Sequence, residues 1–127
     1  MALRIIPQAY APHVQGVLRI ATALLFLQHG TAKIFGFPHV AMFDKMTPML
    51  TAAGWIELVG GALLLVGLFT RPVAFILSGQ MAVAYFYAHA GENLFPILNR
   101  GELAALYCFV FLFFAAAGPG AFSLDDE

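Results

Sequence analysis

Ionisable side chains lie inside apolar stretches of this sequence, where a charge is expensive. His29 and Lys33 are four residues apart near the end of one stretch, and Glu57 lies inside the next. Residues four apart share one face of a helix, so His29 and Lys33 can face the same neighbour. A charge inside a membrane costs about 2.5 kcal/mol or more and usually has a partner or a polar cavity. These side chains could therefore pair with one another, bind a polar ligand or relay a proton.

The composition indicates an integral membrane protein whose partner is the lipid bilayer. Of its 127 residues, 61% are hydrophobic and only 10% are charged, too few charges to cover a soluble domain. The formal net charge of −1, with no basic run, argues against nucleic acid as a partner. The single cysteine, Cys108, allows neither an internal disulfide nor a CxxC redox pair.

Four apolar stretches have about the 20 residues that a helix needs to cross a bilayer. The links between them are short, so we expect a single domain over residues 1–127, an all-α membrane protein. Four transmembrane helices would form an up-down-up-down bundle. Arg4, Pro7 and Pro12 do not fit a signal peptide, so we expect the first span to be retained. The expected spans are 17–35, 51–69, 73–90 and 102–117.

In such a bundle, most polar residues of the spans converge on one leaflet, because successive helices run in opposite directions. This end receives the end of the first span, part of the second, the end of the third and the start of the fourth. The link before the fourth span adds Glu92, Asn93 and Asn99. We expect a polar pocket here, lined by His29, Lys33, Glu57, His89, Arg100 and Glu102. The polar residues left toward the middle or the other side are Arg19, Arg71, Ser78 and Gln80.

Three interpretations of Lys33 and Glu57 stay open. They could form a buried ion pair that holds three helices in register, with His29 hydrogen-bonded into it. They could line a binding pocket for a small amphipathic molecule. Lys33 could also extend to the membrane interface, an explanation that suits Glu57 least.

The histidines and aromatic residues also allow more than one interpretation. His29 and His89 come from different helices at similar depth, a geometry that can ligate haem or a metal. Two histidines without a local ligand motif are a weak signal, so neither haem nor a metal site is expected. Aromatic residues that we interpret as interface anchors or helix-packing groups are Trp55, Tyr85, Tyr87 and Tyr107.

Several short motifs follow one another in an order known from one family. They are an early Arg and a Gly-x-x-Lys in the first span, a Glu followed by a Gly pair in the second, and a His closing the third. A "GE" opens the fourth, and "GPG" and "SLD" follow it. The residues that carry the span motifs are Arg19, Gly30, Lys33, Glu57, Gly60, Gly61, His89, Gly101 and Glu102. From about residue 18 to 125 the chain thus resembles the DoxX family of small four-helix bacterial membrane proteins.

The resemblance implies a protein of the bacterial cytoplasmic (inner) membrane with a link to redox chemistry. The family is named after a subunit linked to a thiosulfate:quinone oxidoreductase, and relatives are associated with oxidative-stress and thiol-handling complexes. Because this chain has no paired cysteines, direct thiol exchange by it is not expected. We therefore expect an integral membrane component of a quinone- or thiol-linked redox pathway, with quinone as the candidate ligand of the pocket.

Two alternatives from other classes remain, and the resemblance does not decide whether the chain is an enzyme. One is a non-catalytic scaffold subunit that packs against partner subunits, or against a second copy, in a larger membrane complex. The other is a small lipid or solute transporter, for which paired discontinuous helices would be the sequence signal.

Overall fold

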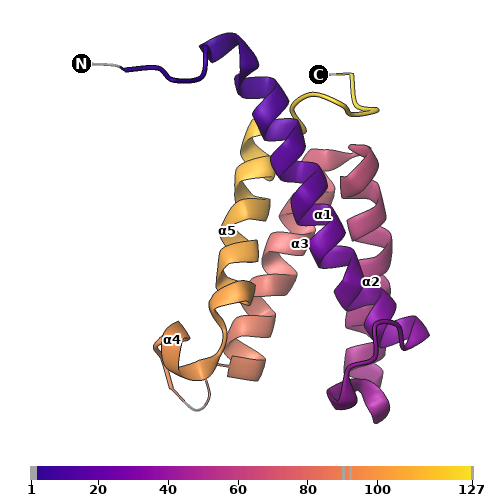
Figure 1. Cartoon of the computed structure of the whole chain (residues 1–127). Helices are drawn as coiled ribbons and strands as arrows, with labels where there is room; N and C mark the ends of the chain where they lie inside the picture. Colours follow the sequence, from indigo (N-terminus) through magenta and orange to yellow (C-terminus); the bar gives the residue numbers. More distant parts are fainter. Residues whose placement is uncertain (1–2, 90, 92, 127) are drawn as a thin grey trace.

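Four long helices form the body of the protein, in a computed structural model that describes residues 3–89, 91 and 93–126 (Figure 1). They are α1 (Ala11–Phe35), α2 (Pro48–Val66), α3 (Thr70–Ala84) and α5 (Glu102–Ala117). Short elements are η1 (Gln8–Tyr10), η2 (Ala41–Asp44), η3 (Tyr85–His89) and α4 (Pro96–Asn99). The described residues contain no strand, which confirms the expected all-α class.

Local capping explains where the helices begin and end. Helix α2 spans residues 48–66 instead of the expected 51–69, because Thr47 caps its start and Gly67 ends it. The Thr47 hydroxyl accepts a hydrogen bond from the N–H of Leu50 at 3.2 Å, and Pro48 occupies the first turn. Gly67 adopts a left-handed conformation with φ of 70°, a common helix terminator. The expected bounds of the fourth span, 102–117, are those of α5.

The third span differs most from the expectation of a helix over 73–90. It begins earlier, at Thr70, and its α-helical part ends at Ala84. A π-helical turn, η3, continues it from Tyr85 to His89, and Ala90 lies outside the described residues. Single π-helical turns that interrupt α-helices are frequent at functional sites. No hydrophobic period marks such a turn, so the sequence could not predict it.

One described helix, α2, is long and apolar enough to cross a membrane by length and composition alone. Helix α5 is apolar but has 16 residues, and the α-helical part of α3 has 15. Helix α1 has 25 residues but carries Arg19 and Lys33 along with other polar side chains. Length and composition therefore support one of the four expected spans.

The helices pack mainly as two pairs, α1 with α2 and α3 with α5, and the tight turn between α2 and α3 joins the pairs. The backbones of α1 and α5 stay apart along most of their lengths and diverge away from the end that holds both terminal segments (Figure 1). The core between the pairs is built from Phe26, Leu64, Leu77, Phe111 and Phe114. Large apolar side chains also cover the outside, among them Leu24, Leu25, Phe75, Ile76 and Phe109.

The close contact between α1 and α2 depends on Gly30. A Cβ atom at Gly30 would lie 2.7 Å from the backbone nitrogen of Leu58, a distance that no side chain tolerates. Small residues let membrane helices approach in this way, since lipid provides no hydrophobic force to press them together. The approach places Lys33, one turn further along α1, beside the α2 residue Glu57.

Candidate functional site

The centre of the candidate site is a buried ion pair between α1 and α2. The Lys33 Nζ atom lies 2.6 Å from Glu57 Oε1 and 2.9 Å from Oε2. The two side chains are 10% and 4% exposed, so the pair is shielded from its surroundings. The Lys33 Nζ atom also lies 5.2 Å from the centre of the Phe43 ring, within range of a cation–π contact. The contact that the ion-pair interpretation of Lys33 and Glu57 requires is therefore present.

Gln80 of α3 is a third member of this cluster, and sequence reasoning left it without a role. Its Nε2 atom donates to Glu57 Oε2 at 3.0 Å and lies 3.5 Å from the carbonyl oxygen of Ala53. Both neighbours are acceptors, so the amide must turn its Oε1 away from them, and that buried oxygen has no partner among the described residues. Gln80 lies on the same helix face as the buried Leu77, a signal that could have revealed its inward position.

His29 and Tyr107 form an aromatic contact beside the ion pair. The His29 ring meets the Tyr107 ring edge to face, with centres 6.1 Å apart and an angle of 89°. Tyr107 in turn stacks on Phe111 at 5.5 Å, and it is buried, as expected for a helix-packing aromatic. In the described part of the chain, His29 makes ring contacts but no hydrogen bond, so the expected bond from His29 into the ion pair is not present.

His89 belongs to a separate network in the link before α5. Its Nδ1 atom lies 3.1 Å from the carbonyl oxygen of Asn99, which makes Nδ1 the protonated nitrogen. The buried Asn99 side chain donates to the Tyr85 hydroxyl at 3.0 Å and to the carbonyl of Asn93 at 2.7 Å. It also accepts from the N–H of Gly101 at 2.8 Å. This network fastens the link to the π-helical turn.

The six residues expected to line one pocket therefore separate into three groups. His29, Lys33 and Glu57 lie together, whereas His89 lies in the Asn99 network. Arg100 and Glu102 are exposed and make no hydrogen bond or ion pair within the described ranges; Glu92 lies outside those ranges. His29 and His89 contact different neighbours, so the structure does not bring them together as a ligand pair.

Arg19 is fully buried at the opposite end of the bundle, and no partner for it was predicted from the sequence. Its guanidinium donates to the carbonyl oxygens of Leu64 at 2.9 Å and Pro119 at 2.5 Å. It also donates to those of Ala121 at 3.0 Å and Phe122 at 2.6 Å. The rigid guanidinium fork suits several acceptors at once. Arg19 thus fixes the segment that follows α5 against α1 and α2.

Asp125 completes this anchor by capping α3. Its carboxylate accepts hydrogen bonds from the backbone N–H groups of Phe69 at 2.8 Å and Thr70 at 3.0 Å. Burial alone would raise the pKa of Asp125, but the hydrogen bonds from Thr70 and Phe69 and the charge of Arg19 together lower that pKa below its ordinary value. The segment lies so close to the α2–α3 turn that a Cβ atom at Gly67 would be 2.4 Å from the Cβ atom of Ser123.

Comparison with known proteins agrees with these features. The sequence profile of the DoxX family matches residues 15–90, more than half of the chain and a range that includes Arg19, Lys33, Glu57 and Gln80. The chain belongs to the DoxX family. The suspected membership is thereby confirmed.

Individual relatives extend the match over most of the chain. An uncharacterized protein of Haemophilus influenzae is 48% identical over 129 residues, with 94% of each chain covered. The inner membrane protein YphA of Escherichia coli is 32% identical over 124 residues, with 86% of each chain covered. A second Escherichia coli inner membrane protein, YqjF, is 28% identical over 117 residues, covering 86% of this chain and 87% of the relative. This DoxX protein is accordingly an inner-membrane protein in contact with the bilayer; no solved structure matches it.

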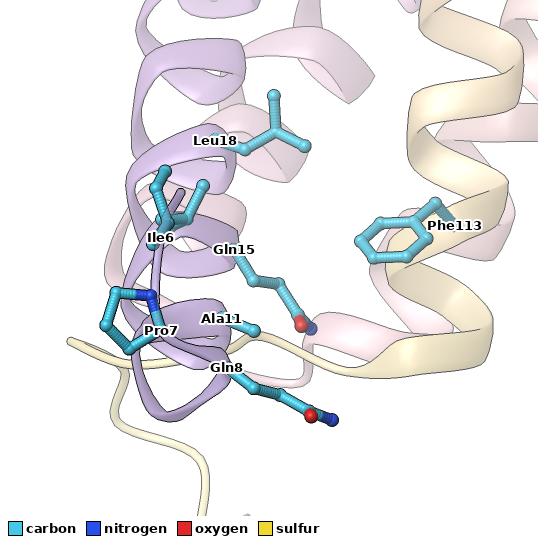
Figure 2. A pocket seen from close by; sticks show the side chains of 8 residues that line it. Ile6, Pro7, Gln8, Ala11, Gln15, Leu18 and Phe113 are labelled. Carbon is cyan, nitrogen blue, oxygen red and sulfur yellow. The ribbon is translucent and has the colours of Figure 1, made fainter. Parts of the chain in front are cut away.

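Two shallow grooves on the surface of this DoxX protein lie away from the Lys33–Glu57 pair. In the first, of about 400 Å³, Gln15 and Leu18 of α1 face Phe113 of α5 (Figure 2). Its other lining residues are Ile6, Pro7, Gln8, Ala11 and Val14. The second, of about 590 Å³, is lined by Pro96, Glu102, Leu103, Ala105, Leu106 and Phe109. Neither groove is lined by Lys33, Glu57 or Gln80.

Proposed function

We propose that this DoxX protein is an integral membrane component of a quinone-linked redox pathway, with a headgroup site centred on Glu57. The observation that carries the proposal is a carboxylate only 4% exposed, held by Lys33 of α1 and Gln80 of α3. Ionisable groups within membrane segments are rare and mark ligand or proton pathways. A network that only joined helices would not need the unpartnered Gln80 oxygen, a buried acceptor that a ligand hydroxyl could satisfy.

The roles of the residues follow from their chemistry. Two N–H groups of Lys33 are directed to Glu57, which keeps the pair charged and fixed. The His29 ring, beside the pair, could donate a hydrogen bond to a quinone oxygen or exchange a proton with it. Glu57 would set the charge of Lys33 and accept a proton when that pair opens. In this proposal His89, Arg100 and Glu102 belong to the mouth of the site.

The same proposal includes four membrane-spanning helices in an up-down-up-down bundle. Three helices are too short or too polar to span a membrane by length and composition alone, but their packing compensates for this. In α1, Arg19 is saturated by carbonyl oxygens and Lys33 is paired with Glu57. The π-helical turn η3 extends α3 to His89, and the outer faces of α3 and α5 carry Phe75, Ile76 and Phe109. Paired charges inside and apolar side chains outside are the arrangement expected in lipid.

Replacement of Glu57 tests the headgroup site. We expect the purified Glu57→Gln protein, incorporated in lipid nanodiscs, to lose binding of decylubiquinone while its helical circular dichroism is retained. The matched control is Asp44→Asn, which makes the same chemical change at an exposed carboxylate paired with His39. Unchanged quinone binding in Glu57→Gln would sink the proposal.

A scaffold subunit is the second candidate, favoured by the finding that neither surface groove reaches Glu57. In that case the Lys33–Glu57–Gln80 cluster would serve only to hold three helices in register. Mass spectrometry of the protein, gently purified from its native membrane, separates the two candidates. Stoichiometric quinone supports the headgroup site, whereas stable partner subunits or a second copy, without any small molecule, support the scaffold.

A further inference from the structure

The seam between α1 and α5 is held by aromatic rings instead of close backbone contact. The Phe26 ring meets Phe111 at 4.9 Å and Tyr107 at 5.3 Å, both edge to face. The next pair along the seam is His29 with Tyr107, at 6.1 Å. The ribbons of α1 and α5 move apart from the end that holds the terminal segments toward the opposite end (Figure 1). Among the described residues, His29 with Tyr107 is the ring contact between α1 and α5 that lies furthest toward this opposite end.

These two side chains have polar atoms that nothing in the described structure satisfies. Neither the Tyr107 hydroxyl nor the His29 ring makes a hydrogen bond within the described residues. The polar atoms that are both enclosed and unpartnered there are Thr70 Oγ1 and Gln80 Oε1, so the Tyr107 hydroxyl is not sealed inside the core. An unpartnered hydroxyl in a membrane interior is costly, because lipid offers no hydrogen bonds in place of water.

The same two side chains are close to the charged cluster. His29 lies one turn before Lys33 on the same face of α1, and its ring meets the Tyr107 ring with centres 6.1 Å apart. A ring inserted between α1 and α5 at this level would therefore contact His29 and Tyr107 directly and lie next to the ion pair. The four long helices each contribute to this level of the bundle: α1, α2, α3 and α5 supply His29 with Lys33, Glu57, Gln80 and Tyr107.

We infer that the headgroup site opens sideways between α1 and α5, and that His29 and Tyr107 contact the ligand there. The ligand class is a flat ring that carries carbonyl or hydroxyl oxygens and an apolar tail. Its oxygen hydrogen-bonds to the Tyr107 hydroxyl, its ring packs against the aromatic seam, and its tail leaves into the lipid between the helices. This inference rests on the proposed function, since it gives the proposed quinone a route and a new contact residue.

The Tyr107→Phe substitution tests the contact, because it removes only the hydroxyl and preserves the ring packing. One lost hydrogen bond should weaken decylubiquinone binding roughly 3- to 10-fold. Tyr87→Phe is the matched control, since Tyr87 is 70% exposed and has the same side chain. Equal affinity of Tyr107→Phe and the unmodified protein would overturn the contact.

Photolabelling tests the route. A quinone with a diazirine in its tail should label peptides of α1 and α5, and the labelling should be suppressed by excess decylubiquinone. Suppressible labelling confined to α2 and α3 would overturn the lateral opening.

Different results would contradict the headgroup site and its opening between α1 and α5. If the unmodified protein binds no quinone, both the headgroup site and the lateral opening are wrong. If Glu57→Gln abolishes binding but Tyr107→Phe leaves it unchanged, the headgroup site stands and its opening between α1 and α5 is wrong.

Discussion

Arg19 and Lys33 are both cations on α1, about four helical turns apart, yet the protein surrounds them differently. Arg19 donates to four backbone carbonyl oxygens from α2 and the segment after α5, and it is fully enclosed. Lys33 meets one carboxylate, and among the described residues the Gln80 oxygen and the Tyr107 hydroxyl have no hydrogen-bond partner.

The difference separates an anchor from a site. A polar group whose hydrogen-bonding capacity is used entirely by the protein has nothing left for a ligand, and removing it leaves several buried acceptors unpaired. A cluster with spare donors and acceptors is less complete as a support but can recognise another molecule. On this reasoning the Arg19 end should dominate stability, and the Glu57 end should dominate binding.

The largest effect on stability is expected from Arg19→Met. This substitution leaves two buried and two partly buried carbonyl oxygens without their donor and releases the segment after α5, so we expect a loss of about 3–5 kcal/mol in unfolding free energy. Thermal unfolding in detergent, followed by circular dichroism, measures it. Arg100→Met is the control, because Arg100 is exposed. Equal melting temperatures for the two variants would contradict the role of Arg19 as a stabilising anchor.

A smaller effect is expected at the ion pair. Glu57→Gln leaves Lys33 buried beside a neutral amide, which should cost about 2–3 kcal/mol. Lys33→Met in the same protein should recover part of that loss, because it removes the uncompensated charge. A double-mutant cycle should then give a coupling energy of about 1–3 kcal/mol. Additive effects of the two substitutions would show that the pair does not stabilise the bundle.

The ion pair was one of three interpretations that the sequence allowed, whereas nothing in the sequence indicated the anchor, and the reason is physical. Lys33 and Glu57 are side chains of opposite charge in apolar stretches, so each indicated the other. The partners of Arg19 are backbone carbonyls, which every residue has and which leave no mark in a sequence. The role of Gln80 was not predicted because its side chain carries no charge, although its position on the buried face of α3 could have been inferred from the sequence.

For the helices too, some features could be predicted from the sequence and others could not. Pro48 and Gly67, the residues that bound α2, are visible as letters, yet hydropathy alone moved the expected span by three residues. The π-helical turn at Tyr85–His89 and the cap that Asp125 provides for α3 depend on contacts between distant segments. Those contacts hold His89 in a different network from His29, and the directions of the helices alone could not predict this separation.

A pH dependence is expected from Asp125, at the anchor end. Because its pKa is lower in the folded protein than in the unfolded chain, its contribution is fully present above the ordinary value of 3.8. That contribution is lost as the pH falls through the lowered, folded-state value. Asp125→Ala should cost about 1 kcal/mol near neutral pH, as for other helix caps. Melting temperatures between pH 7 and pH 3 should fall less steeply for this variant; parallel curves would contradict the cap.

The smallest effect on stability is expected from Tyr107→Phe, and Tyr85→Phe provides the contrast. The Tyr85 hydroxyl donates to the carbonyl of Leu94 at 2.8 Å and accepts from Asn99 at 3.0 Å, so its removal should cost about 1–2 kcal/mol. The Tyr107 hydroxyl makes no hydrogen bond among the described residues, so its loss should leave the unfolding free energy unchanged or raise it slightly. Chemical unfolding of both variants without ligand makes the comparison. A destabilisation of Tyr107→Phe equal to that of Tyr85→Phe would mean that the Tyr107 hydroxyl is already satisfied and not held in reserve for a ligand.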